Sequence, residues 1–229
     1  MAVIMSKQMG IPSVNKKASN YAIGESVFLN VGGVLKEFLV VNQGKPSNLY
    51  SCDNTDVFLM MKDIYTLMYY HSGSVTYPNS SVYSYLENTF YPLFGELEKS
   101  VVKQIKIPYN ASAYSISVVS GNNGALVKAF IPSFAEMGIS ASDMPADGTV
   151  FSYFNRTSAS KAAAYNGTNV AWWMRTPYVL EYGNQGYISS TGTSYNAVDA
   201  AHNSGVRPTI AISADAKFDP NTNTLIEVA

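Results

Sequence analysis

The sequence predicts a single α+β domain in which antiparallel sheets, two helices and long loops enclose one core. Three observations predict it: β-branched runs separated by glycine turns, apolar residues at helical spacing between residues 81 and 105, and no repeat, heptad or long linker in 229 residues. That length also suits two small domains, but nothing divides the chain. We therefore place the domain at residues 21–214, an N-terminal arm at residues 1–20 and a C-terminal tail at residues 215–229.

The composition is poor in charge and rich in tyrosine. Charged residues make up 14% of the chain, whereas about 25% is typical of soluble domains. Hydrophobic residues make up 47%, and the formal net charge is −1. This balance argues against a nucleic-acid binder, an acidic tail protein and a disordered protein. With 17 tyrosines, the chain is typical of a rigid β-rich domain that offers aromatic and amide groups to a partner.

The first regular element expected is a β-hairpin. Residues 27–31 and 34–41 form two largely apolar runs, and Gly32 and Gly33 between them supply the positive φ angles of a primed turn. The apolar run at residues 57–61 predicts a buried strand. Further strands are expected at residues 114–119, 126–131, 150–154, 170–175, 186–190, 195–199 and 205–212.

Two helices are expected between these groups of strands. Ser81 is the expected N-cap of the first helix, and Pro92 closes or kinks it. Its apolar positions are Val82, Tyr85, Leu86, Phe90 and Leu93. The second amphipathic stretch has its apolar positions at Leu97, Val101, Val102 and Ile105.

The arm at residues 1–20 contains Pro12 and no regular period, but it carries apolar side chains. These are Val3, Ile4, Met5, Met9, Ile11 and Val14. Two interpretations stay open: a frayed terminus, or an extended arm that orders against a neighbouring subunit. The first 17 residues lack the basic and apolar regions of a secretory signal, so we expect synthesis in the cytoplasm. No apolar stretch of about 18 residues predicts a membrane span.

The residues that carry chemistry are scarce. The single cysteine, Cys52, excludes an intrachain disulfide and a thiolate metal site. His71 and His202 are the only histidines, and neither lies near a nucleophile pattern. No spacing of His, Cys or carboxylates indicates a metal site, and no glycine-rich loop has the partners of a phosphate cradle. We therefore expect no enzymatic activity, no metal and no cofactor.

Two motifs stand out in the last third of the chain. The first is Trp172-Trp173-Met174-Arg175-Thr176-Pro177, and the second is Gly205-Val206-Arg207-Pro208. Alternation along a strand points the Trp172 and Trp173 rings to opposite faces. A buried arginine has five donors to satisfy, and loop carbonyls are natural acceptors. Arg175 and Arg207 are therefore interpreted as structural staples that gather loops, with ligand binding as the alternative.

These motifs resemble those of an uncharacterised bacterial and phage domain family with a Trp-Trp-Leu-Arg-Ser-Pro-like sequence and a Gly-Val-Arg-Pro sequence near its end. The resemblance extends to residues 81–90 and covers roughly residues 22–213. That family resembles proteins with the C-type-lectin-like fold. Formylglycine-generating enzymes and phage receptor-binding proteins also have this fold. The resemblance implies a C-type-lectin-like domain in a surface-exposed or virion protein.

The function expected from these observations is structural: a bacteriophage virion protein, as a capsid decoration, tail or baseplate subunit. Its partners would be other virion subunits, contacted through the arm, and copies of itself in a homo-oligomer. The alternative is a receptor- or glycan-binding module for host attachment, because exposed Tyr and Asn side chains bind sugars by stacking and hydrogen bonding. The candidate ligand-binding residues are Tyr178, Tyr182, Asn184, Gln185 and Tyr187. A hydrolase of cell-wall polymers is the least favoured hypothesis.

Overall fold

The computed structural model describes most of the chain and places it around one continuous hydrophobic core. The described residues are 15–73, 75–140, 144–157, 159–179, 183–193 and 195–226. Most of the predicted arm, and Tyr182 of the predicted ligand-binding surface, therefore lie outside the described residues.

The first of the two main sheets has the strand order β16-β4-β3-β2, and all neighbours in it are antiparallel. Its strands are β2 (Ser26–Val31), β3 (Val34–Gln43), β4 (Val57–Met61) and β16 (Thr209–Ile212). The predicted hairpin is confirmed: Gly32 and Gly33 join β2 to β3 with φ angles of 62° and 84°. The predicted buried strand is also confirmed, because every residue of β4 is buried.

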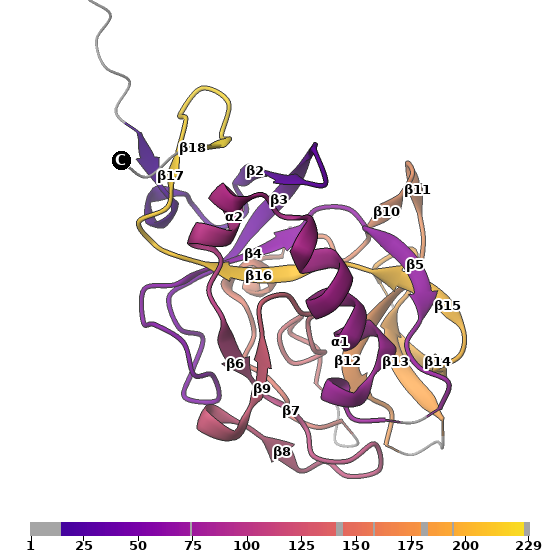
Figure 1. The fold of residues 1–229 in the computed structure, drawn as a ribbon. Helices are drawn as coiled ribbons and strands as arrows, with labels where there is room; N and C mark the ends of the chain where they lie inside the picture. Colours follow the sequence, from indigo (N-terminus) through magenta and orange to yellow (C-terminus); the bar gives the residue numbers. More distant parts are fainter. Residues whose placement is uncertain are drawn as a thin grey trace, which may run out of the picture.

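The second main sheet is mixed and has the order β14-β13-β12-β15-β5. Its strands are β5 (Thr66–Tyr69), β12 (Trp172–Pro177), β13 (Asn184–Ile188), β14 (Tyr195–Asp199) and β15 (Asn203–Val206). Only the pairing of β12 with β15 is parallel among the ladders of this sheet. Figure 1 shows β12 and β13 in the half of the molecule opposite the hairpin of β2 and β3.

The two main sheets share one bent antiparallel ribbon. Strand β4 pairs with β16 in the first sheet, and β5 pairs with β15 in the second. The chain passes from β4 to β5 through residues 62–65 and from β15 to β16 through Arg207 and Pro208. Strands that change sheet in this way form the corners of sheet packings. Arg207 therefore sits at the joint between the sheets.

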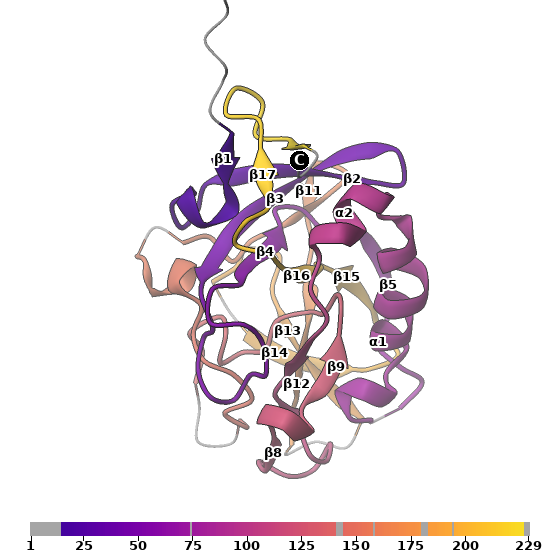
Figure 2. The ribbon, with the colours of Figure 1, turned by 60° about the vertical axis from the view of Figure 1, so that its left-hand side comes forward.

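Several short pairings complete the architecture. A three-stranded group, β1-β17-β18, lies at one end of the molecule, and the pair β7-β8 lies at the other (Figures 1 and 2). The short strands are β1 (Lys16–Lys17), β6 (Ile105–Ile107), β7 (Tyr109–Asn110), β8 (Val118–Val119), β9 (Ala125–Val127), β10 (Ala164–Tyr165), β11 (Thr168–Asn169), β17 (Lys217–Phe218) and β18 (Leu225–Ile226). Because β1 pairs with β17, residues from the end of the predicted arm and from the predicted tail pack together.

The helices are shorter than the apolar spacing predicts. Helix α1 spans only Ser81–Tyr85 and continues as a π-helical turn, Leu86–Phe90, and a 3-10 turn. Its N-cap is Ser80 rather than Ser81, because the Ser80 hydroxyl accepts a hydrogen bond from the Tyr83 amide at 3.0 Å. Helix α2 spans Glu96–Val101, and the predicted apolar position at residue 105 instead begins β6.

The predicted α+β, C-type-lectin-like class with two helices is therefore wrong. Strands make up 36% of the described residues and helical residues 16%, and these strands are divided among six small sheets. The apolar spacing of the first segment fits a π-helical turn as well as an α-helix, so the α-helix ends at Tyr85, and the second segment leaves its helix after Val101 and continues into β6. The helical segments cover one side of a mostly β structure (Figure 2).

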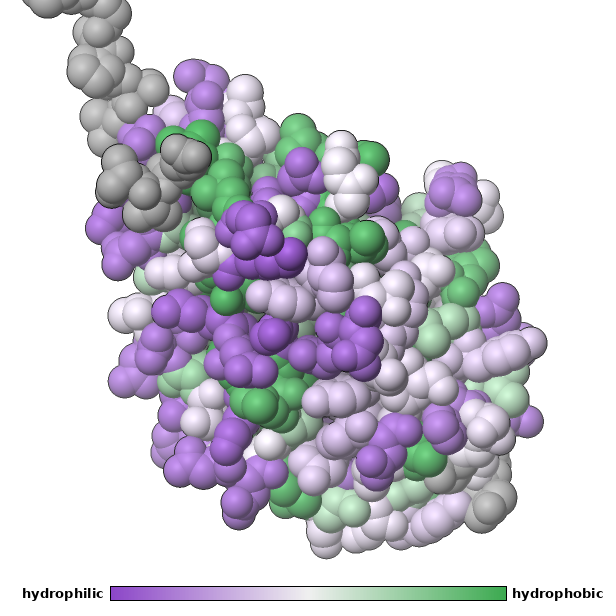
Figure 3. Space-filling model, viewed as in Figure 1, coloured by the Kyte–Doolittle hydropathy of each residue, from purple (hydrophilic) through white to green (hydrophobic). Residues whose placement is uncertain are grey.

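Exposed apolar side chains are dispersed. On the face shown in Figure 3, hydrophobic residues form separate groups among polar ones. The large apolar side chains with the highest exposure among the described residues include Val34 and Leu35 at the β2–β3 turn, Tyr69 in β5, and Tyr114 and Ile116 between β7 and β8. Isolated apolar residues of this kind are ordinary on protein surfaces and do not by themselves indicate a binding face.

Candidate functional site

The two arginines of the sequence motifs are both 1% exposed, but their surroundings differ. Arg175 lies in β12, and Arg207 lies at the joint between β15 and β16. A buried guanidinium has to satisfy five N–H donors. The two arginines differ in the hydrogen-bond acceptors that surround each guanidinium.

Arg175 makes five hydrogen bonds. Its Nε donates to the carbonyl of Pro108 at 2.9 Å, and its terminal nitrogens donate to the carbonyls of Ile131 and Asp147 at 3.0 and 2.7 Å. The same two nitrogens bind both carboxylate oxygens of Glu136 at 2.7 and 2.6 Å. Burial alone would lower the pKa of Arg175, but the Glu136 carboxylate holds it above its ordinary value. Three loops and one strand therefore meet at one permanently charged side chain.

Glu136 is held on its other sides as well. The Ser133 amide donates to Glu136 Oε2, and the Glu136 amide donates to the Ser133 hydroxyl, which is the reciprocal pattern of a capping box. The Tyr50 hydroxyl donates to Glu136 Oε1. Burial, and next the negative charge of Glu136, raise the pKa of Tyr50 well above its ordinary value, so the phenol stays protonated.

Asp147 adds a second buried carboxyl beside this ion pair. The Thr176 hydroxyl donates to Asp147 Oδ1 at 3.0 Å and accepts the Phe134 amide at 2.9 Å. Burial raises the pKa of Asp147 to about 7, although the positive charge of Arg175 opposes this shift. A Cβ at the next residue, Gly148, would lie 2.8 Å from the Glu136 side chain, so glycine permits this close approach. We call Tyr50, Glu136, Asp147, Arg175 and Thr176 the Arg175 cluster.

Arg207 has far fewer partners. Its Nε donates to the Met61 carbonyl at 2.7 Å, and its guanidinium carbon lies 5.0 Å from the centre of the Trp172 ring. Nη1 is buried and has no hydrogen-bond partner among the described residues. Burial lowers the pKa of Arg207 to about 10, so the group keeps its charge at neutral pH.

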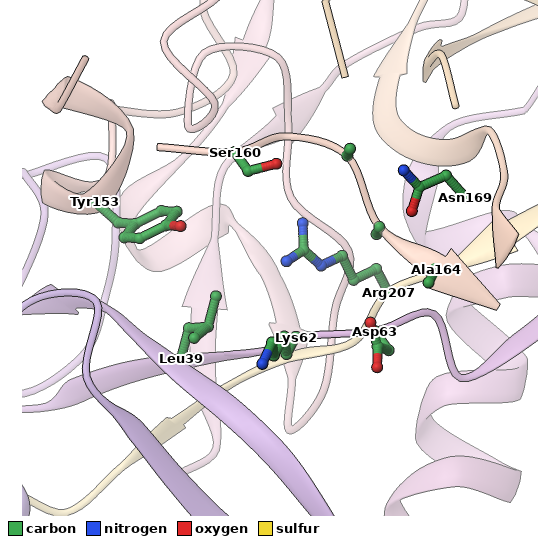
Figure 4. A pocket seen from close by; sticks show the side chains of 10 residues that line it. Leu39, Lys62, Asp63, Tyr153, Ser160, Ala164, Asn169 and Arg207 are labelled. Carbon is green, nitrogen blue, oxygen red and sulfur yellow. The ribbon is translucent and has the colours of Figure 1, made fainter. Parts of the chain in front are cut away.

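Arg207 lines a cavity of about 310 Å³ (Figure 4). The guanidinium projects between Tyr153, Ser160 and Asn169 in this view. The other lining residues are Leu39, Lys62, Asp63, Ala162, Ala163 and Ala164. The polar rim is exposed, whereas Arg207 is buried. We call this feature the Arg207 cavity.

The two tryptophans begin strand β12, which also carries Arg175, and the Trp172 ring lies against Arg207. Trp172 and Trp173 are fully buried, and their ring nitrogens donate to the carbonyls of Lys161 and Met68, each at 2.9 Å. The two acceptors belong to segments far apart in sequence. The tryptophan pair therefore fixes β12 between the segment that lines the Arg207 cavity and strand β5.

The residues of the predicted ligand-binding surface that the structure describes are buried or half-buried. Gln185 is 2% exposed, and its side-chain amide donates to the carbonyls of Met174 and Thr176 at 2.7 and 2.8 Å. Its amide N–H groups therefore bridge strands rather than face a ligand. Tyr178, Asn184 and Tyr187 are half-buried in and beside β13.

His71 follows strand β5, and Cys52 lies between β3 and β4. His71 Nδ1 lies 3.1 Å from the Ser81 hydroxyl at an exposed position. Burial raises the pKa of Cys52 to about 11, which keeps its thiol protonated at neutral pH. No three His, Cys, Asp or Glu residues among those described are grouped to hold a metal ion. The helices that the structure describes are all too short or too polar to cross a membrane.

Most of these elements lie within a stretch of the chain that matches a known protein family. A family model described as a domain of unknown function, DUF6273, matches residues 54–214. The chain belongs to the DUF6273 family. No curated protein and no solved structure matches it. The DUF6273 match contains both arginines and the whole second sheet, whereas β2 and β3 precede it.

Sequence reasoning missed three members of the Arg175 cluster in this DUF6273 chain: Tyr50, Glu136 and Asp147. One signal was present, because Ser133-Phe134-Ala135-Glu136 has the spacing of a capping box. That pattern predicts the local bonds of Glu136, but it does not predict that the carboxylate also binds an arginine 39 residues later.

We predict that Arg175→Met strongly destabilises the DUF6273 domain. The substitution leaves the Glu136 carboxylate buried without its counter-charge, which costs about 3–5 kcal/mol of unfolding free energy. Urea unfolding followed by circular dichroism measures this loss. Arg156→Met is the matched control, because Arg156 is exposed and donates to a single loop carbonyl. Its expected loss is below about 1.5 kcal/mol, and equal losses in the two variants would contradict the prediction.

The raised pKa of Asp147 predicts a pH-dependent stability. The folded state binds the proton more tightly than the unfolded state, so the carboxyl costs stability once it ionises. Its cost is absent below about pH 4, grows as pH rises, and is complete above about pH 7. Asp147→Asn mimics the protonated carboxyl, so its stability relative to the wild type should increase across this window.

Urea titrations at several pH values test this expectation. Asp215→Asn is the control, because Asp215 is exposed and the hydrogen bond from Lys17 lowers its pKa. Its effect should be small and of the opposite sign. Parallel stability profiles for the wild type and Asp147→Asn would show that Asp147 does not carry the dependence.

Proposed function

We propose that this DUF6273 protein is a non-enzymatic structural subunit of a phage virion, as a capsid decoration, tail or baseplate protein made in the host cytoplasm. The single observation that carries the proposal of a contact scaffold is the Arg175 cluster. Every donor of a buried arginine is used to join loops, which suits a domain that presents a fixed surface. The virion setting is supported by the two arginine- and proline-containing motifs at residues 172–177 and 205–208 and by the apolar residues of the arm.

The two motifs acquire separate roles under this proposal. Trp172-Trp173-Met174-Arg175 builds the strand that anchors the Arg175 cluster, and Gly205-Val206-Arg207-Pro208 builds the joint between the two sheets. A Cβ at Gly205 would lie 2.7 Å from the Ile64 side chain, so the joint requires a close packing of the two crossing segments. We propose these motifs as the structural signature that links the chain to bacterial and phage relatives.

A second candidate function is attachment to the host surface, and the Arg207 cavity favours it. The cavity places a buried positive charge below an exposed polar rim, and a small number of polar or charged groups in a pocket fixes the orientation of a bound small molecule. Attachment and a structural role are compatible, since one domain can be held in a particle and present a binding site outward. The proposed partners are other virion subunits, copies of this chain, and a host-surface glycan.

Mass spectrometry of purified virions tests the structural proposal. The expected result is that the chain is present in intact particles at a fixed ratio to the other subunits. A chain that is abundant in the infected-cell lysate but missing from the particles would refute a virion role.

Deleting residues 1–14 tests the proposed arm. The cut is placed before β1, because Lys16 pairs with Phe218 and Ala18 is 1% exposed, so a longer deletion would damage the domain itself. We expect the shortened chain to keep the unfolding temperature of the full chain and to lose incorporation into particles. Normal incorporation of the shortened chain would contradict an assembly role of the arm.

A further inference from the structure

The Arg207 cavity lies where several separate parts of the chain meet. Leu39 comes from β3, Lys62 and Asp63 from the β4–β5 connection, Tyr153 from a 3-10 turn, and Ser160 and the alanines at 162–164 from the segment that leads into β10. Asn169 of β11 and Arg207 complete the wall (Figure 4). Because Leu39 belongs to the first main sheet and Arg207 joins the two sheets, both sheets set the position of the guanidinium.

The Arg207 guanidinium is the one feature of this cavity that its structural contacts do not explain. Burying an N–H donor without an acceptor costs about 1–3 kcal/mol. Burial lowers the pKa of Arg207, and Tyr153 and then Asp63 oppose this shift only in part. No hydrogen bond or ion pair joins Asp63 to Arg207 among the described residues. Lys62 is already paired with Glu37 at 3.0 Å. Arg207 therefore remains free to bind an anion from the cavity.

The charges around the cavity argue against a ligand with two negative charges. Lys62 is paired with Glu37, which leaves the positive charge of Arg207 beside the negative charge of the exposed Asp63. A dianionic phosphate would meet repulsion from the exposed Asp63 carboxylate. A carboxylate carries one charge and matches the planar fork of a guanidinium.

The rim favours a polyhydroxylated molecule attached to that carboxylate. Asp63, Asn169 and Ser160 offer exposed acceptors and donors, and neighbouring hydroxyl groups of a sugar bind carboxylate and amide side chains. The Tyr153 ring and the alanines at 162–164 supply an apolar wall, and aromatic rings pack on the apolar faces of such ligands. A volume of about 310 Å³ has room for one monosaccharide unit.

We propose that the Arg207 cavity binds the carboxylate of an acidic sugar residue, with Arg207 as the anion-binding group and Asp63 and Asn169 as hydroxyl-binding groups. This proposal rests on the attachment role above, because it names the ligand class of that role. It does not rest on the virion assignment.

Isothermal titration of the full chain with galacturonate, glucuronate and N-acetylneuraminate tests the proposal. At least one of these acids should bind, and its neutral counterpart, such as galactose, should bind at least about tenfold more weakly, as expected for the loss of one charge-assisted interaction. Inorganic phosphate and an acetylated dipeptide with a free carboxyl group should also bind more weakly.

Three variants locate the site. Arg207→Lys should weaken acid binding by about 10- to 100-fold, because it removes the planar donor pair while keeping the charge. Asp63→Asn should strengthen it, because it removes a nearby negative charge. Asn169→Ala should weaken both acidic and neutral sugars. Asp63 and Asn169 are exposed, so the last two variants remain informative if Arg207→Lys fails to fold.

Each outcome decides the proposal. Absence of binding by all three acids overturns it, as does equal binding of galactose and galacturonate. Tighter binding of phosphate or of the dipeptide assigns the cavity to another ligand and also overturns it. If the acids bind but virions lack the chain, the cavity proposal stands and the virion assignment fails. If host adsorption requires the chain but no acid binds, attachment stands and the cavity proposal fails.

Discussion

The buried ion pair between Arg175 and Glu136 is the interaction on which the irregular half of this structure depends. Between β9 and β12 the chain has only short regular elements, so backbone hydrogen bonds alone do not hold these loops. The guanidinium supplies donors to the carbonyls of Pro108, Ile131 and Asp147. A charge in a dry interior is stable only when it is fully paired, so the loops and the ion pair require each other.

The two motif arginines illustrate how identical side chains acquire different properties. Both lie in short motifs in which a proline follows the arginine, directly or after one residue, and both are buried. Arg175 has a carboxylate and three carbonyls around it, so its charge is neutralised inside the protein. Arg207 has one carbonyl and the face of Trp172. The same residue type thus serves as a framework element at one position and as a candidate anion-binding group at the other.

Short sequence patterns correctly predicted those elements that are determined by interactions between residues close in sequence. The glycine pair between apolar runs predicted the hairpin of β2 and β3, and the uninterrupted run predicted β4. The helices were overestimated because the same apolar spacing fits the π-helical turn Leu86–Phe90 and extends past the end of helix α2 to the first residue of β6. Gln185 was assigned to a surface because amides are common in loops, but carbonyls freed by the irregular pairing of β12 bind its side chain inside the sheet. The ion pair between Glu136 and Arg175 cannot be predicted from one sequence, because the residues around each of them give no information about the distant partner.

The ribbon shared by the two sheets has a mechanical consequence. The chain crosses from β15 to β16 in two residues, and the neighbouring crossing from β4 to β5 is held against it by the Arg207–Met61 and Tyr65–Val206 hydrogen bonds. Because the β15–β16 and β4–β5 connections are short and hydrogen-bonded to each other, one sheet cannot rotate freely against the other. A force applied to the hairpin of β2 and β3 is therefore transmitted to β12 and β13. Under such a force the domain should unfold in a single step, with both sheets breaking together.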